Sequence, residues 1–332
     1  MKLRHFLFFL ALVVIVVLAY TQYNQVQSFG SLLKQVHWWV LIFALPLRYL
    51  YYRSNAKYFQ HFFAVFKQEV PFGKLTEATI TMNFINIVFP SGGISGLGYM
   101  RKVLYPKIDS TNTTLAQLCW YLLSFFAYVL FLILAFVLLL LSNQVIRISS
   151  RVIVLVLFIL LAVAIAGVIF IFSPKITENM TLIAFKPINA ILKLIKKRIF
   201  GRKRIKNFLS QIRESVVFLK NNHDKLRKPF LYAALMIVWD TATIYLIFLA
   251  FGQVINPGIV IAGYIIALIT SLVAVVTAGI GVYEAGMVAT FVGLGVPFDT
   301  AFAVTIFYRV IALWLFIPVG LLFYKRTLLD EK

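Results

Sequence analysis

Six apolar runs, each long enough to cross the ~30 Å hydrocarbon core of a bilayer, recur along this 332-residue chain. A membrane-spanning helix needs about 17–25 mostly apolar residues, and the runs cover residues 6–21, 36–52, 115–141, 152–173, 230–251 and 300–324. Hydrophobic residues make up 62% of the chain and charged residues only 13%, whereas a soluble domain has roughly 45–50% and 25%. We therefore predict an all-α polytopic membrane protein, with residues 1–332 in a single integral membrane domain.

Two of these runs have features that affect how they insert. Lys2 and Arg4 precede the first run, as in a signal peptide, but no small-residue cleavage pattern follows Tyr20. We expect an uncleaved membrane anchor there. Pro46 interrupts the second run and should kink its helix, because proline removes an intrahelical hydrogen bond.

Two further apolar regions, 77–105 and 258–294, are broken by glycine near their middle. If each enters and leaves on one side of the membrane, 27 of the 32 Lys and Arg residues lie in cytoplasmic segments, 15 of them in residues 174–229. Cytoplasmic loops carry the excess of Lys and Arg in membrane proteins. We therefore predict two re-entrant hairpins beside about six full spans. The first hairpin enters from the cytoplasm and the second from outside, and both chain ends are cytoplasmic in the cell membrane.

This topology places residues 36–141 and 230–324 in opposite orientations, as an inverted repeat. Interrupted segments at matching places in two halves point to a transport site near the bilayer midplane. Non-helical backbone at that depth must be buried in protein or line a watered cavity, because lipid cannot satisfy its hydrogen bonds. The alternative is that the glycines only let helices pack closely.

The first hairpin contains the stretch FPSGGISGLG, from Phe89 to Gly98. The half-helix after this break would present free N–H groups to an anion such as a phosphate. Polar residues before the break either line the cavity or hydrogen-bond the broken backbone, and a basic residue after it either meets lipid phosphates or snorkels as an anchor. The candidates are Asn83, Asn86, Pro90, Ser91, Gly92, Gly93 and Arg101.

Three ionisable residues lie deep within the apolar regions: Asp240, Glu284 and Arg309. A charge at that depth costs at least a few kcal/mol and normally has a partner. A structural salt bridge from Arg309 to Glu284 or Asp240 is one interpretation. In the other, Arg309 holds a lipid phosphate by forked hydrogen bonds, and a carboxylate holds a cationic head group or a proton. Two acids against one arginine leave one carboxylate without an obvious partner.

Residues 174–229 form a strongly basic segment within a chain of net charge +21. Apolar residues recur there at helical spacing opposite lysines, which is typical of amphipathic helices on an anionic membrane surface. We therefore expect membrane lipids, and not nucleic acid, as the partner of this segment. The chain has one cysteine, Cys119, and four histidines without ligand spacing, so we expect no metal and no cofactor.

The second hairpin and the last run resemble the flippase-like transmembrane domain family, which is found fused to lysylphosphatidylglycerol synthases and also as stand-alone proteins. The resemblance is carried by AGIGVYE, residues 278–284, by the Tyr308-Arg309 pair, and by NIVFPSGG, residues 86–93. Directly after NIVFPSGG, Ile94-Ser95-Gly96 stand where many members have a glycine-glutamate pair. The resemblance implies movement of an amphipathic lipid between leaflets, with Glu284 and Arg309 as cavity residues. Gly279, Gly281, Tyr283 and Tyr308 are further candidates because they lie within these motifs.

We therefore expect a lipid flippase or transporter and not an enzyme. Because the sequence has no Walker A motif for ATP, the transporter would be of the secondary type, driven by a gradient or by consumption of the product. One alternative is an intramembrane enzyme acting on a lipid or polyprenyl phosphate, which would need a nucleophile or general base near a partner. Another is a non-transporting membrane assembly partner. A homo-oligomer or a separate lipid-modifying enzyme could accompany the protein.

Overall fold

The computed structural model describes residues 36–89, 93–142, 207, 210, 214, 215, 217–271 and 281–329. Within these residues the regular structure is helical throughout, which confirms the predicted all-α class. The predicted runs 6–21 and 152–173, and most of the basic segment 174–229, lie outside the described residues.

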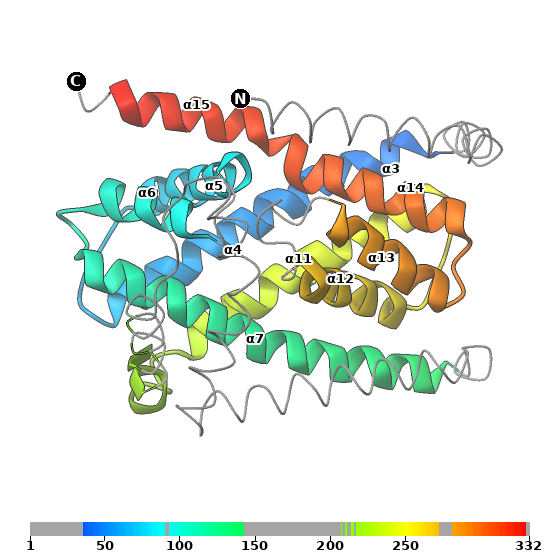
Figure 1. Cartoon of the computed structure of the whole chain (residues 1–332), viewed down its shortest axis with the longest axis horizontal. Helices are drawn as coiled ribbons and strands as arrows, with labels where there is room; N and C mark the ends of the chain where they lie inside the picture. Colours follow the sequence, from blue (N-terminus) through cyan, green and yellow to red (C-terminus); the bar gives the residue numbers. More distant parts are fainter. Residues whose placement is uncertain are drawn as a thin grey trace, which may run out of the picture.

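Helices α4 (Ala44–Ala64) and α11 (Arg227–Ala250) form the centre of the molecule (Figure 1). They pack closely and run antiparallel, since Arg48 meets Asp240 whereas His61, later in α4, stacks on Tyr232, earlier in α11. The indole of Trp239 donates to the Ser54 hydroxyl at 3.0 Å, and the short helix α3 (Trp38–Ile42), which precedes α4, lies beside the end of α11. Because α4 belongs to the first predicted half and α11 to the second, the two halves meet along this pair.

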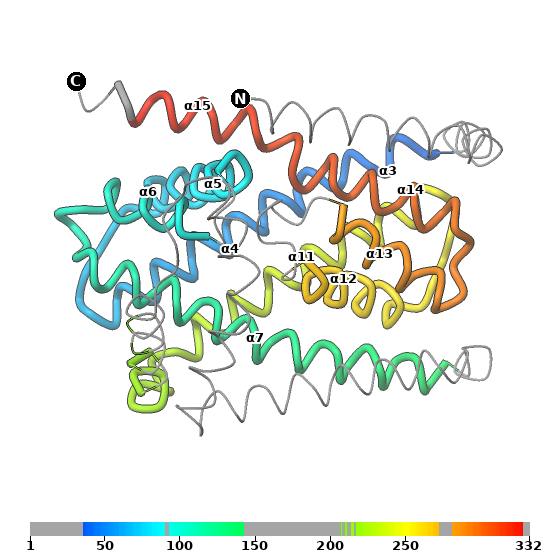
Figure 2. Tube along the Cα trace, in the orientation of Figure 1, coloured from blue at the N-terminus to red at the C-terminus, as the bar shows by residue number. Residues whose placement is uncertain are grey.

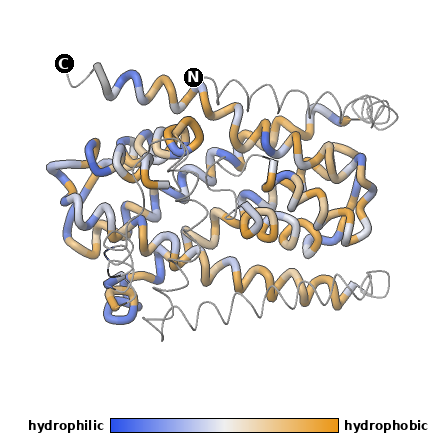
Figure 3. Tube along the Cα trace, viewed as in Figure 1, coloured by the Kyte–Doolittle hydropathy of each residue, from blue (hydrophilic) through white to orange (hydrophobic). Residues whose placement is uncertain are grey.

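Long helices lie on opposite sides of this central pair and follow the long axis of the molecule (Figure 2). One is α7 (Ser110–Leu141); the other is the continuous stretch of α14 (Phe298–Arg309), the π-helix η3 (Val310–Trp314) and α15 (Phe316–Leu329). Among the described residues, α7, α11 and Phe298–Thr327 are long and apolar enough to cross a membrane. Figure 3 shows hydrophobic residues along most of α7. These helices match the predicted runs 115–141, 230–251 and 300–324.

Both glycine-broken regions fold into pairs of short helices, α5 (Phe72–Val88) with α6 (Ile94–Leu104), and α12 (Pro257–Ser271) with α13 (Val282–Gly293). Helices α6, α12 and α13 have 11, 15 and 12 residues, and α5 has 17, at the lower limit of the about 17–25 that a full crossing needs. The two pairs lie toward opposite ends of the long axis (Figure 1). The lengths and places suit hairpins that enter from opposite sides, and the re-entrant topology stays a prediction.

The second helix of each hairpin and the helix after it recur at one sequence interval. Gly93 and Gly281 are the N-caps of α6 and α13, both with positive φ, and they are 188 residues apart. The N-caps of α7 and α14, Asp109 and Pro297, are also 188 residues apart. The positive φ explains why both hairpin turns use glycine, since a side chain is strained in that conformation. Packing repeats as well, because α5 packs on α15 as α12 packs on α7.

The second predicted run, 36–52, differs from its prediction in two ways. The helix is interrupted at Phe43, between α3 and α4. Pro46 therefore lies in the first turn of α4 and not within a kinked helix. Proline would clash with the carbonyl of Ile42, four residues earlier, if the helix were continuous. Helix α4 also continues to Ala64, beyond the apolar run, because α5, α7 and α11 bury its second half.

Close packing of α12 on α13 depends on Gly263, where an added Cβ would overlap the ring of the buried Phe291. Overpacking of this kind costs about 1–3 kcal/mol. We expect Gly263→Ala to lower the melting temperature in detergent. Gly98→Ala, which meets open space in α6, should preserve or raise it, since alanine favours helix by about 1 kcal/mol over glycine.

Phe291→Leu should relieve the overlap, so that the double variant with Gly263→Ala loses less stability than the two single losses combined. Equal melting temperatures for Gly263→Ala and Gly98→Ala would show that α12 and α13 do not pack as described.

Candidate functional site

The carboxylate of Asp240 lies at the centre of the fold and is bound by residues from three other helices. Arg48 of α4 donates to Oδ1, as does the hydroxyl of Tyr308 of α14 at 2.8 Å. The hydroxyl of Tyr264 of α12 donates to Oδ2 at 2.6 Å. Asp240 and Arg48 are each 3% exposed. A buried charge is tolerated when it is paired and its remaining lone pairs are hydrogen-bonded, and Asp240 meets both conditions.

The prediction that one carboxylate lacks a partner is therefore wrong, because Arg48 is the partner of Asp240. Arg48 lies inside the predicted run 36–52 and pairs with Asp240 from 192 residues away. The rule that singled out Asp240, a charge deep in an apolar run, applies equally to Arg48 and could have found it. No sequence signal marked Tyr264, a tyrosine in an apolar helix.

Arg48 also contacts the segment that follows Arg309. Its Nη2 donates to the carbonyl of Ala312 at 3.4 Å, within the π-helix η3. The guanidinium lies 4.3 Å from the ring centroid of Tyr51, a cation–π distance. The ring of Tyr52, the next residue, has its centroid 5.7 Å from the same guanidinium. Asn83 of α5, a predicted cavity residue, is half-buried.

A second ion pair joins Glu284 and Arg309. It is one of the two pairings that were predicted for Arg309. Arg309 Nε donates to Glu284 Oε1 at 2.5 Å, and the backbone N–H of Gly281 donates to Oε2 at 2.6 Å. Glu284 thus caps the N-terminus of α13, where a negative charge is favourable. The side chains of Arg309 and Glu284 are 14% and 19% exposed, against 4% and 5% for Arg48 and Asp240. The second pair is therefore the more accessible one.

Tyrosines connect the two ion pairs. Tyr308 and Arg309 are consecutive residues, so one turn of α14 supplies a ligand to Asp240 and the partner of Glu284. The ring of Tyr283 stacks on Tyr308, with centroids 6.5 Å apart, and Arg309 lies 4.7 Å from the centroid of the same ring. The Tyr283 hydroxyl is buried without a hydrogen-bond partner among the described residues. The pairs therefore form one site with a sealed part and a partly open part.

The remaining predicted residues lie elsewhere or outside the described chain. The side-chain oxygen of Asn86 accepts from the backbone N–H of Gly96 at 2.8 Å, so it bonds the broken hairpin, one of its two predicted roles. Gly93 caps α6. Arg101 is exposed in the last turn of α6, at the opposite end of this helix from Gly93. Pro90, Ser91, Gly92 and Gly279 lie outside the described residues.

Within the described ranges, no three His, Cys, Asp or Glu side chains lie together as metal ligands would. The site is instead built from two arginine–carboxylate pairs and a group of tyrosines.

The apolar helices and the charges held between them define a polytopic helical membrane protein with an ionic interior site. The model of the lysylphosphatidylglycerol synthase TM region family matches residues 7–320, and the chain belongs to this family. A UPF0104 membrane protein of Methanothermobacter thermautotrophicus is 27% identical over 114 residues. That alignment covers 33% of this chain and 34% of the relative, so the chain matches about a third of the curated relative's length.

The sealed pair gives a stability prediction. Asp240→Asn should lower the free energy of unfolding by about 3–5 kcal/mol, because it leaves Arg48 charged and buried without a carboxylate. Arg48→Met should lower it by a similar amount, because it leaves the buried Asp240 carboxylate without its cation. The double variant should lose clearly less than the sum of the two, since neither buried charge remains. Unfolding in mixed detergent micelles measures all three.

The exposed pair Asp224–Arg227, with side chains 68% and 81% exposed, serves as the matched control. Asp224→Asn and Arg227→Met should each change stability by less than about 1 kcal/mol. Additive losses at Arg48 and Asp240 would contradict their direct pairing.

Proposed function

We propose that this protein is a flippase or transporter of the secondary type, which moves an amphipathic phospholipid or lipid-linked head group between leaflets. The observation that carries the proposal is the accessible Glu284–Arg309 pair at the N-terminus of a half-length helix. Membership in a family named for a lipid-modifying enzyme's membrane region supports a role with lipids.

Arg309 suits a lipid phosphate. Within the described chain it bonds Glu284 through Nε alone, so its terminal nitrogens remain available for a forked bond to an anion. Arginine binds phosphate in this bidentate manner, with charge-assisted hydrogen bonds. A phosphate that displaces Glu284 would also meet the N–H of Gly281 at the end of α13, where the helix dipole favours negative charge. The Arg309 guanidinium and the Gly281 N–H, which hold the carboxylate, can thus also hold a head group.

Glu284 then has a role of its own in the proposal. Once displaced, its carboxylate can hold a cationic head-group substituent or take up a proton. Either event neutralises a charge that would otherwise be costly in the membrane interior. The Asp240 cluster stays closed during this exchange, because its carboxylate is already saturated by Arg48, Tyr264 and Tyr308.

The proposal is transport without chemical change to the lipid. Its energy would come from an ion gradient or from consumption of the lipid on the far side. We further propose that the basic segment 174–229 lies on the anionic cytoplasmic leaflet, with both chain ends on that side of the cell membrane. A homo-oligomer or a lipid-modifying enzyme would be a partner in the same bilayer.

Vesicles containing the purified full-length protein and a fluorescent phospholipid test the proposal through the rate of exchange between leaflets. Glu284→Gln and Arg309→Ala should each slow exchange by roughly tenfold or more, because each removes a charge-assisted hydrogen bond worth ~1.5–3 kcal/mol. Arg309→Lys keeps the positive charge but cannot donate two parallel hydrogen bonds. Its exchange rate should lie between those of these two variants and that of the wild type.

Arg227→Ala removes an arginine from an exposed ion pair and should leave exchange unchanged. Each variant is first shown to be monodisperse with a melting temperature near that of the wild type. Wild-type exchange rates in both Glu284→Gln and Arg309→Ala would reduce the pair to a structural role. Chemical modification of the lipid during the assay would favour an intramembrane enzyme instead.

A further inference from the structure

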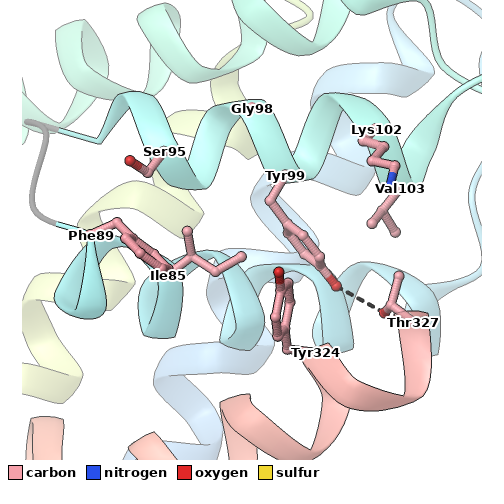
Figure 4. Close-up of a pocket in the computed structure, with 9 residues that line it drawn as sticks. All are labelled: Ile85, Phe89, Ser95, Gly98, Tyr99, Lys102, Val103, Tyr324 and Thr327. Atoms are coloured by element: carbon pink, nitrogen blue, oxygen red, sulfur yellow. Dashed lines mark hydrogen bonds between the residues drawn. The ribbon is translucent and has the colours of Figure 1, made fainter. Parts of the chain in front are cut away.

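A pocket of about 350 Å³ lies between the first hairpin and the last described helix, and neither Glu284 nor Arg309 lines it (Figure 4). It is formed by α5, α6 and α15, and its lining residues are Ile85, Phe89, Ser95, Gly98, Tyr99, Lys102, Val103, Tyr324 and Thr327. Its volume is at the small end of the roughly 300–1,000 Å³ of ligand pockets. It would hold one acyl chain and not a whole two-chain lipid.

The lining changes in character along the pocket (Figure 4). Ile85 and Phe89 lie at one end, and Lys102 lies at the other. The hydroxyls of Tyr99 and Thr327 hydrogen-bond at 3.0 Å and so join α6 to α15. Hydroxyl groups lie along the pocket, with Ser95 near Phe89 and Thr327 toward Lys102. Apolar side chains at one end and a cation at the other match the acyl chain and the phosphate of a phospholipid.

Glycines determine where the helices touch and where they part. An added Cβ at Gly320 of α15 would overlap Phe84 of α5, so the two helices are in tight contact there. At Gly98 of α6, an added Cβ would meet nothing within 4 Å. The absent side chain at Gly98 therefore leaves the pocket open without any neighbour filling the space.

Phe89, at the apolar end of the pocket, is 59% exposed. In a membrane protein such a side chain faces lipid tails, not water. The opposite end is basic, since α6 ends with Arg101 and Lys102 and contains no acidic residue. A basic group near a membrane surface attracts anionic lipid head groups.

We propose that this pocket binds one acyl chain of an anionic phospholipid, whose phosphate lies beside Lys102. Arginine and lysine both bind phosphate, lysine as a point charge. This site is distinct from the Glu284–Arg309 pair, and the inference does not depend on transport. If lipid does cross the protein, the pocket would hold lipid at the predicted cytoplasmic side.

Photocrosslinking in vesicles tests the site directly. The full-length protein is reconstituted in phosphatidylcholine vesicles with a small fraction of phosphatidic acid that carries a diazirine in one acyl chain. After irradiation, labelling is quantified in peptides that cover residues 85–103 and 324–327. A second preparation uses diazirine-labelled phosphatidylcholine, which differs in the head group alone. We expect these peptides to be labelled more strongly by the anionic lipid.

Two variants separate the contributions of shape and charge. Gly98→Leu should fill the open space and reduce labelling by both lipids several-fold. Lys102→Gln should remove most of the preference for phosphatidic acid, about fivefold for one basic residue, and leave labelling by phosphatidylcholine unchanged. Gly73→Leu, also placed in open space, and Lys107→Gln, an exposed lysine after α6, are the matched controls and should behave as the wild type.

Equal labelling by the two lipids in the wild type, or full labelling in Gly98→Leu, would overturn the proposal. Loss of labelling in excess inorganic phosphate would identify a soluble-anion site and overturn it too. If Gly98→Leu does not fold, Lys102→Gln still decides, because its side chain is exposed. Exchange between leaflets is measured separately. Labelling that persists in Glu284→Gln while exchange is lost would show that the pocket and the ion pair are independent.

Discussion

The ion pair between Arg48 and Asp240 is the interaction on which the arrangement of the two halves depends. Burying either charge alone would cost several kcal/mol, so α4 and α11 gain most when they cross at the register that pairs them. Along α11, Asp240 lies where two hydrophobic clusters meet, one including Phe59 and Met236 and the other including Phe248 and Ile244. Apolar packing on either side tolerates small shifts, whereas the charge pair does not. It fixes the register that the apolar surfaces leave open.

The same pair positions the accessible site through Tyr308. Because Tyr308 is held on Asp240, the next residue, Arg309, projects toward α13 and Glu284. The helix then widens into the π-helix Val310–Trp314, and Arg48 donates to a carbonyl within it. π-Helical turns are uncommon and often lie at functional sites. The buried guanidinium of Arg48 therefore binds both the Asp240 carboxylate and a carbonyl of the π-helix that follows Arg309. Arg309 itself stays accessible.

Sequence reasoning predicted the elements better than their partners. The ranges of α7 and α11 follow from apolar length, and both hairpin breaks follow from glycines whose positive φ other residues adopt only with strain. The pairing of Arg309 with Glu284 was one of two options, because both acids lie at similar depth. The Arg48–Asp240 contact spans 192 residues and depends on the crossing of two helices, which no local pattern encodes. The extension of α4 to Ala64 likewise depends on tertiary burial of polar sequence.

The repeat shows that the two hairpins are not chemically equivalent. At the interval of 188 residues that relates the halves, Glu284 corresponds to Gly96 and Arg309 corresponds to Tyr121. In the second half a carboxylate caps the hairpin helix and holds an arginine; in the first half an uncharged amide, Asn86, accepts from the backbone of Gly96. The equivalent positions in the first half therefore carry no charge. At these two positions the ion pair therefore belongs to the α12–α13 hairpin, whereas the basic groups of the first hairpin, Arg101 and Lys102, lie in the last turn of α6. The two hairpins would thus hold a charged head group at different places along their helices, although the fold that contains them is repeated.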